Sequence, residues 1–380
     1  MATGRLAIQV VQCRHRHLDF VRFPYRLYRR DGNWVAPFAR EESRRWDPKH
    51  NPSLKGRWHQ RFLALRDARV VGRIAASTDP AFAERWEART GFFGFFECED
   101  DPEAARALLD AAGSALHRQG IDLALGPVNL SMHDESGLLV EGFDTPPMVL
   151  SPYNGRYVPA LLESAGCRPR MHFSSYLWTP KVRVRPAVAR VLEGLARENQ
   201  GATHVRVRRV DLSRFDDECR LLLNLYNETF RNLWGFVPMS HEEFRARAKA
   251  FRAFLRPELI LVLEVNGIPE GFCLALPDVN AALLPLRGRL WPFGWMRLMR
   301  SIPNLDTARL LLLGVRDTAA GRRHALRLAA AVHEAALGLG LRKAELSVVQ
   351  SRNAPMRHII EAFGAPACKT YRLYERDCDE

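Results

Sequence analysis

The sequence predicts an α/β protein made of two tandem copies of one domain, each with a mixed central sheet flanked by helices. One observation is that both halves of the chain carry the same order of predicted strands and helices. Another is that landmark residues recur at a nearly constant distance. The separations are 199 positions for Gly72 and Gly271, 199 for Asn154 and Asn353, and 198 for Gly166 and Gly364.

The first half opens with a predicted strand–turn–strand at 61–77 and a third apolar strand at 91–100. A helix is expected over 101–120, because Asp101 can cap its start and Gly120 suits its stop. The remaining elements are a strand at 121–129, a helix at 153–167 and a final strand at 172–178.

The second half repeats this order. Its elements are a strand–turn–strand at 258–276, a strand at 308–315, a helix at 322–340, a strand at 341–350, a helix at 353–365 and a final strand at 369–375. We therefore expect an N-terminal domain over 1–180 and a C-terminal domain over 181–380. Additional helical segments are expected at 186–199, 211–231 and 240–254.

Charge and cysteine usage narrow the classes of function. The net charge of +13 favours anionic partners, but the arginines are spread along the chain without a nucleic-acid-binding motif, so nucleic acid is the weaker interpretation. The seven cysteines are scattered and never form a CxxC pair, which argues for reduced thiols and against a metal cofactor. With no signal peptide and no apolar run of ~18 residues, we expect a cytoplasmic protein.

The repeated pattern, with its turn between the third strand and a long helix, resembles the GCN5-related N-acetyltransferase (GNAT) superfamily across nearly the whole chain. Several stretches are also similar to a bacterial subfamily of tandem acyltransferase-like proteins associated with ceramide synthesis. These stretches are "VRFPYRLYRRDGNWVAP" (21–37), "GFFGFFECEDD" (91–101), "GPVNLSMHDESGLLVEGFDTPP" (126–147) and "YNETFRNLWGFVPMSHEEF" (226–244).

The resemblance implies a site for the pyrophosphate of an acyl donor, either acyl-CoA or an acyl carrier protein, where the third strand of the second copy turns into its long helix. Unpaired amides and the helix dipole attract anions there, and arginines would add charge-assisted bonds. The alternative is a solvated basic helix start. The expected donor-binding residues are Val315, Arg316, Gly321, Arg322, Arg323 and, for the pantetheine arm, Asn353.

The family pattern Q/R-x-x-G-x-G/A fits this turn imperfectly. Aligned by the helix start it falls on "AGRRHA" (320–325), which puts Arg323 at a glycine position. Shifted by four residues it falls on "RDTAAG" (316–321), which keeps Arg316 and Gly321 but has Ala319 in place of the first glycine.

The equivalent turn of the first copy is acidic. Its carboxylates would repel a pyrophosphate, so we expect a degenerate donor site in the first domain. They could instead hold a cationic amine substrate, for which Glu97 is the candidate, or they could simply form an acidic helix start. The carboxylates are Glu97, Glu99, Asp100, Asp101 and Glu103.

Acyl transfer to an amine needs a proton acceptor for the amine and a proton donor for the leaving thiolate. The polar loop "NLSMHDESG" supplies His133, Asp134 and Glu135 as acceptor candidates; a turn-capping role or, less readily, a metal site are the alternatives. Glu228 is a further acceptor candidate. The tyrosine that serves as acid in many GNAT enzymes is replaced by Ile360, so Tyr371, Tyr374 or Tyr157 would have to substitute, and we favour Tyr371.

The remaining candidates concern the acceptor. We expect contacts from Asn129, Tyr153, Asn232 and Trp234. The segment 282–305 interrupts the second copy with apolar and arginine residues; it could lie on the inner membrane surface, form a lid over an acyl chain, or cover the core.

Together these features predict an N-acyltransferase that moves an acyl group from acyl-CoA or an acyl carrier protein to an amine, with a sphingoid base and a (dihydro)ceramide product as the specific hypothesis. A non-catalytic ligand-binding protein of the same fold is the alternative, because the turn is altered and the helix tyrosine is missing.

Overall fold

The structure is a computed structural model that describes residues 4–198 and 204–378. It divides into two compact units. The first comprises residues 1–172, 283–290 and 369–380, and the second comprises 173–282 and 291–368. The division of the chain into domains 1–180 and 181–380 stays a prediction.

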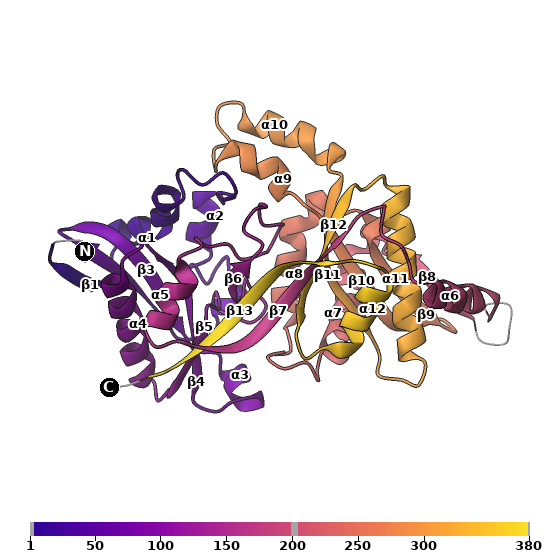
Figure 1. The fold of residues 1–380 in the computed structure, drawn as a ribbon, viewed down its shortest axis with the longest axis horizontal. Helices are drawn as coiled ribbons and strands as arrows, with labels where there is room; N and C mark the ends of the chain where they lie inside the picture. Colours follow the sequence, from indigo (N-terminus) through magenta and orange to yellow (C-terminus); the bar gives the residue numbers. More distant parts are fainter. Residues whose placement is uncertain (1–3, 199–203, 379–380) are drawn as a thin grey trace. The chain divides into compact units, whose positions relative to one another are not determined.

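The first unit is a mixed sheet with helices on both faces (Figure 1, indigo to magenta, with β13 in yellow). Its sheet has the order β1-β2-β3-β4-β5-β13, with β6 paired to β13. All neighbours are antiparallel except β4 and β5, which are parallel. Its strands are β1 (Leu6–Val10), β2 (His59–Arg66), β3 (Arg69–Ser77), β4 (Thr90–Cys98), β5 (Leu123–Gly126), β6 (Leu138–Glu141), the start of β7 (Arg168–Trp178) and most of β13 (Ala367–Asp377).

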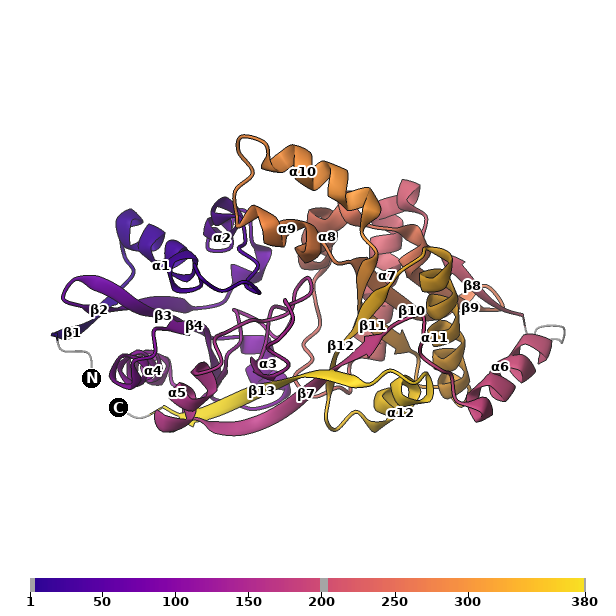
Figure 2. The ribbon, with the colours of Figure 1, turned by 45° about the horizontal axis from the view of Figure 1, so that its top comes forward.

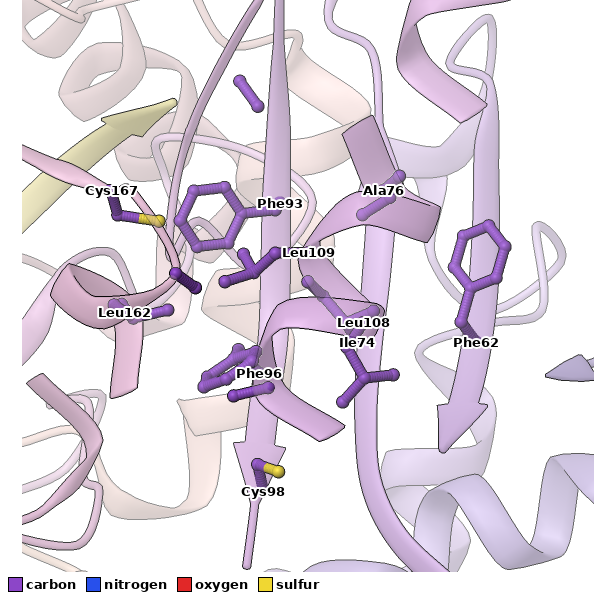
Figure 3. Close-up of a cluster of buried hydrophobic side chains, with 14 of the residues drawn as sticks. Phe62, Ile74, Ala76, Phe93, Phe96, Cys98, Leu108, Leu109, Leu162 and Cys167 are labelled. Carbon is purple, nitrogen blue, oxygen red and sulfur yellow. The ribbon is translucent and has the colours of Figure 1, made fainter. Parts of the chain in front are cut away.

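Helices cover both faces of this sheet, with α1 on one side and α4 on the other (Figure 2). The helices are α1 (Arg14–Leu27), α2 (Ala39–Arg44), α3 (Pro80–Arg85), α4 (Pro102–His117) and α5 (Val158–Ser164). Because neither face meets water, β3 is buried at nearly every position rather than at alternate ones. Figure 3 shows one of the two core layers, in which Leu108 and Leu109 of α4 lie beside Ile74 of β3 and Phe93 of β4.

The second unit repeats this architecture. Its sheet has the order β8-β9-β10-β11-β12-β7, again antiparallel except for the parallel pair β11 and β12. Its strands are β8 (Val205–Arg209), β9 (Ile260–Val265), β10 (Ile268–Pro277), β11 (Thr307–Val315), β12 (Lys343–Gln350) and residues 173–178 of β7. Its helices are α6 (Pro186–Glu198), α7 (Phe215–Thr229), α8 (His241–Phe251), α9 (Asn280–Leu283), α10 (Gly294–Ser301), α11 (Gly321–Gly338) and α12 (Ala354–Ala362).

The two units exchange their closing strands. Residues 173–178 of β7, from the first half of the sequence, pair with β12 in the second unit. The last strand of the chain, β13, pairs with β5 and β6 in the first unit. The predicted α/β class and the repeat of the fold are therefore confirmed, with an exchange that the sequence analysis did not anticipate.

Candidate active site

The strands β11 and β12 of the second unit separate along their length. Their parallel pairing joins Thr307–Leu310 to Lys343–Leu346, whereas the strands run on to Val315 and Gln350. In addition, β11 carries a bulge, since Leu274 of β10 pairs with Leu312 and Ala275 pairs with Leu310. Within the described residues, no rung of the parallel ladder lies beyond Leu310, so two facing backbone edges are left for an extended molecule.

The turn that follows β11 is basic. The segment from Arg316 to Gly321 forms the turn itself, so the alignment on "RDTAAG" spans it and the alignment on "AGRRHA" lies in the helix. Helix α11 starts without a side-chain cap and without an acidic residue in its first turn. Arg322 and Arg323 occupy that first turn and are exposed. A Cβ on Gly321 would lie 2.8 Å from the carbonyl oxygen of Arg316, which explains the glycine.

Arg316 is held by two carboxylates. Its Nε donates to Glu228 at 3.0 Å and its Nη1 donates to Glu270 at 3.3 Å, while its amide donates to the Glu270 carbonyl at 2.8 Å. Val315, the last residue of β11, is half-buried against the helix core. The structure therefore brings Arg316 and Glu228 together at the turn.

The end of α7 packs directly against β11. A Cβ on Gly314 would lie 2.4 Å from Thr229 Oγ1, so only glycine fits there. The loop after α7 is tied on both sides: Asn227 bonds both the amide and the carbonyl of Met239, and Gln350 of β12 donates to the Trp234 carbonyl at 2.7 Å.

The sequence analysis named Trp234 but missed Gly314 and Gln350. Within the loop, Trp234 is half-buried and Asn232 is exposed. The sequence did carry a signal for each: Gly314 interrupts the apolar run 310–315, and Gln350 ends a predicted strand.

Helix α12 lacks the family tyrosine, as expected. Asn353 caps this helix, accepting a hydrogen bond from the Met356 amide at 3.2 Å. Ile360 is buried in a cluster with Tyr176 and Val349. Asn353 is thus a helix cap, and its contact with a donor stays a prediction.

Two buried charged residues, which the sequence analysis also missed, lie on the last rungs before β11 and β12 separate. Arg309 and Glu345 are register partners and are only 3% and 2% exposed. Register partners on adjacent strands present their side chains on the same face. Burial of charge is costly unless it is paired, and it concentrates at functional sites.

The matching turn of the first unit is closed by its own side chains. Four of its five acidic groups are paired with an arginine, and Asp101 also caps α4 by accepting from the Ala104 amide. The pairs, with their donor–acceptor distances, are Arg73–Glu97 at 2.6 Å, Arg69–Glu99 at 2.5 Å, Arg66–Asp101 at 2.8 Å and Arg66–Glu103 at 2.8 Å.

The gap between β4 and β5 is closed as well. Their parallel pairing covers only Thr90–Phe92, as in the second unit. Beyond it, Asn129 Oδ1 accepts from the Phe95 amide at 2.8 Å, and the Val128 amide donates to the Phe93 carbonyl at 2.8 Å. The chain's own loop therefore occupies the place that stays open between β11 and β12.

The polar loop after β5 is a connected cluster. Glu135 accepts from Arg45 at 2.8 Å and from Asn129 at 3.4 Å, and Ser131 donates to Asp134 at 3.0 Å. Burial by itself would raise the pKa of Glu135, but the Arg45 guanidinium outweighs it and holds that pKa below its ordinary value. His133 lies half-buried in the same turn, with its amide donating to Ser131 Oγ.

Two predicted tyrosines also lie in the first unit. Tyr371 of β13 is fully buried beside this loop, since a Cβ on Gly137 would lie 3.6 Å from the Tyr371 Cβ. Tyr153 donates to Asp31 at 2.7 Å, and burial followed by the Asp31 contact raises its pKa. Of the predicted residues, this unit holds Glu97, Asn129, His133, Asp134, Glu135, Tyr153 and Tyr371, together with the alternatives Tyr157 and Tyr374. The second unit holds Glu228, Asn232, Trp234, Val315, Arg316, Gly321, Arg322, Arg323 and Asn353.

Two curated proteins match almost the whole chain. The first, named bacterial ceramide synthase, from Caulobacter vibrioides (strain NA1000 / CB15N), is 35% identical over 366 residues and covers 94% of each chain. The chain belongs to the bacterial ceramide synthase family. The second, Protein YghO of Escherichia coli K12, is 32% identical and covers 94% of this chain and 92% of its own length.

Solved structures show that the fold of this family member is that of the GNAT enzymes. A GCN5-related N-acetyltransferase from Sphaerobacter thermophilus matches with a TM-score of 0.53 at 12% identity, over 100% of this chain and 98% of that one. A tandem GNAT protein from the clavulanic acid biosynthesis pathway matches with a TM-score of 0.53 at 11% identity, over 99% of both chains. No profile of a known protein family matches the sequence.

Family and fold together identify the protein as an acyltransferase of the N-acyltransferase type. Across residues 4–198 and 204–378, no group of three His, Cys, Asp or Glu side chains could hold a metal ion. No helix in this described part of the chain is both long and apolar enough to cross a bilayer.

Proposed function

We propose that this N-acyltransferase transfers a fatty acyl group from a phosphopantetheine thioester, acyl-CoA or acyl carrier protein, to the amino group of a sphingoid base, giving a (dihydro)ceramide. The relative named bacterial ceramide synthase, which matches over 94% of both chains, supports this acceptor. The donor class is supported by the geometry of the second unit.

The contrast between the two strand-to-helix turns carries the proposal. At the same place in the fold, one turn is capped and filled by carboxylate–arginine pairs, while the other is uncapped and presents arginines. A helix start of the second kind attracts phosphate. We therefore assign donor binding to the second unit and a degenerate donor site to the first.

In this assignment the donor phosphates lie at the start of α11, against Arg322 and Arg323. The pantetheine arm is an extended chain with two amide groups, which can bond the facing backbone edges of β11 and β12 as an added strand would. Arg316, fixed by Glu228 and Glu270, orients the turn. Asn353 uses its side-chain oxygen for the helix cap, and its NH2 group is assigned to the arm.

The reaction joins the amine nitrogen to the thioester carbonyl carbon and breaks the carbon–sulfur bond. One proton leaves the amine, and the released thiolate takes up a proton. For the acceptor of the amine proton we propose Glu345, because it lies where β11 and β12 begin to separate. The roles of His133 as proton acceptor and of Tyr371 as proton donor stay predictions.

The test is to incubate pure protein with long-chain acyl-CoA or with acyl carrier protein, together with sphinganine, and to measure amide by mass spectrometry and free thiol by absorbance. We expect amide and thiol in equal amounts with at least one donor. A folded protein that forms no amide with either donor contradicts the proposed reaction.

A double variant that reverses the charge of two arginines tests the donor site. Arg322→Glu with Arg323→Glu is expected to abolish the stabilisation by CoA, which for the parent protein amounts to ~2.7 kcal/mol at a CoA concentration 100-fold above Kd. Thermal unfolding with and without CoA measures this. Arg118→Glu with Arg206→Glu, at two exposed positions outside the turn, is the matched control. Equal stabilisation of both double variants by CoA would place the phosphates elsewhere.

A further inference from the structure

Residues 291–293 and helix α10 expose a concentrated group of large apolar side chains. Trp291, Phe293, Trp295 and Met299 are 84%, 70%, 50% and 54% exposed, and we call these four residues the apolar tip. They account for half of the eight large exposed apolar side chains on the described residues. Soluble proteins rarely gather such residues in one place without a partner for them.

The charge around the apolar tip has one sign. From Val279 to Leu305 the sequence contains no Asp or Glu. Arg297 and Arg300 of α10 are exposed beside the tip, and among the ion pairs of the described residues neither has a carboxylate partner. An apolar surface ringed by unneutralised arginines is complementary to an anionic surface with an apolar interior.

A cavity of about 570 Å³ adjoins this surface, because Phe293 of the apolar tip is one of its lining residues. Residues of α10, among them Met296, Arg297 and Arg300, line it together with Asp306 and Arg342, which are paired with each other. Helix α10 thus carries its two arginines at the boundary between the exposed tip and a hollow of headgroup size. Figures 1 and 2 show α10 (orange) as a separate helix beyond the strands of its unit.

We propose that this segment docks the protein on the surface of an anionic phospholipid bilayer. The apolar tip enters the boundary between headgroups and acyl chains, where tryptophan rings are favoured. Arg297 and Arg300 bond lipid phosphates, and the cavity receives a headgroup. The occupant is a bilayer because the segment 291–300 presents apolar and cationic groups but no acidic group, which matches an anionic lipid surface better than a protein surface of mixed charge.

This inference stands on the surface of the second unit alone and holds whatever amine the enzyme acylates. If the acceptor is a long-chain lipid amine, docking would also place the enzyme where its substrate and product dissolve. The two proposals can therefore fail separately, one in a binding measurement and the other in an activity measurement.

The experiment is co-sedimentation of the full chain with vesicles of phosphatidylcholine, with and without phosphatidylglycerol. We expect binding to the phosphatidylglycerol vesicles that weakens as salt is added. Arg297→Gln with Arg300→Gln should lower the partition coefficient roughly thirtyfold, since each surface arginine contributes a factor of about five. Trp291→Ser with Phe293→Ser should lower it on both kinds of vesicle by about tenfold or more.

Matched controls are available at exposed positions outside this segment. Arg118→Gln with Arg206→Gln removes the same charge, and Ile268→Ser with Leu337→Ser removes exposed apolar surface. Both controls should bind vesicles as the parent does, and all variants should keep the thermal midpoint of the parent. Acyl transfer between water-soluble short-chain substrates should be unchanged by the docking variants.

Three results would overturn the proposal. One is that the parent does not bind the anionic vesicles, and another is that the docking variants bind as well as their controls. The third is that light scattering shows a dimer that Trp291→Ser with Phe293→Ser converts to a monomer, which would assign the apolar tip to a second copy of the chain.

Discussion

At the scale of single residues, the recurring glycines mark the same packing solution in both units. A Cβ on Gly72 would lie 2.7 Å from Leu108 Cδ1, and a Cβ on Gly271 would lie 3.2 Å from Leu328 Cδ1. Each glycine therefore lets a leucine of the long helix sit against its strand. The glycines recur in the sequence because the same close contact between a strand and a helix recurs in each unit.

The glycines after the short helices also correspond. Gly166 and Gly364 have φ of +91° and +76° and follow α5 and α12. In each case the residue after the glycine donates to a carbonyl in the last turn, so the left-handed position closes the helix. Such residues could be predicted because one local conformation demands glycine.

The burial of the charged residue Glu345 leads to a prediction for its substitution. Glu345→Gln is expected to lower kcat by at least about 10²-fold, the contribution typical of a proton-transfer group, with KM for the donor little changed. Steady-state kinetics across pH measure this. The exposed Glu334→Gln is the control. An unchanged kcat with a lowered thermal midpoint would show that the role of Glu345 is structural only.

At the scale of elements, Arg45 and Glu135 join the end of α2 to the polar loop. Because the pKa of Glu135 is lowered in the folded protein, its pairing stabilises the fold above the unfolded pKa of about 4.5 and is lost as the pH falls through the folded pKa. Glu135→Gln should therefore cost roughly 3 kcal/mol at neutral pH.

This cost should shrink as the pH falls below about 4.5, because the unfolded parent takes up a proton there whereas the folded parent does so only at lower pH. Urea unfolding of parent and variant at a series of pH values measures the difference. The exposed Glu84→Gln is the control and should cost almost nothing at any pH. A constant difference down to pH 3 would mean that the charge of Glu135 does not contribute.

Most elements could be predicted because their periodicity and end signals agree. The hairpin strands, the long helices α4 and α11, and the Asp101 and Asn353 caps follow this rule. The first strand of each sheet, β1 and β8, was missed. Both are edge strands with few buried residues, "LAIQV" and "VRVRR", so their pattern carries little hydrophobic signal.

The candidate site was less predictable than the fold. The position of the basic turn followed from the order of elements, but the partners of its charges did not. The pairing of Arg316 with Glu228 joins residues 88 positions apart, and that of Arg73 with Glu97 joins two strands. Taken one by one in the sequence, charged residues such as Arg316 and Glu97 were predicted to bind substrates. In the fold, several of these residues form ion pairs with other side chains of the protein.

At the scale of the whole molecule, the exchange of β7 and β13 predicts that a fragment cut at residue 180 does not fold on its own. The fragment 1–180 lacks β13, and so it should be unfolded or aggregated when expressed alone, since β5 and β6 would lose their partner strand. Circular dichroism and thermal unfolding of the fragment test this.

A supplemented fragment is the matched comparison. Residues 1–172 joined through a flexible linker to 366–378 should regain a cooperative unfolding transition. If the unsupplemented fragment 1–180 unfolds just as cooperatively, β13 is dispensable for the first unit.

The exchange of strands also affects the order in which the two units can fold during synthesis. The first unit needs a strand that ends at Asp377, about 200 residues after the rest of its sheet has been translated. At the usual pace of a ribosome this is a delay of roughly 10–40 s. During that interval β5 and β6 have an open edge, so the nascent chain is a natural client for a chaperone, and a truncated product is a candidate for rapid degradation.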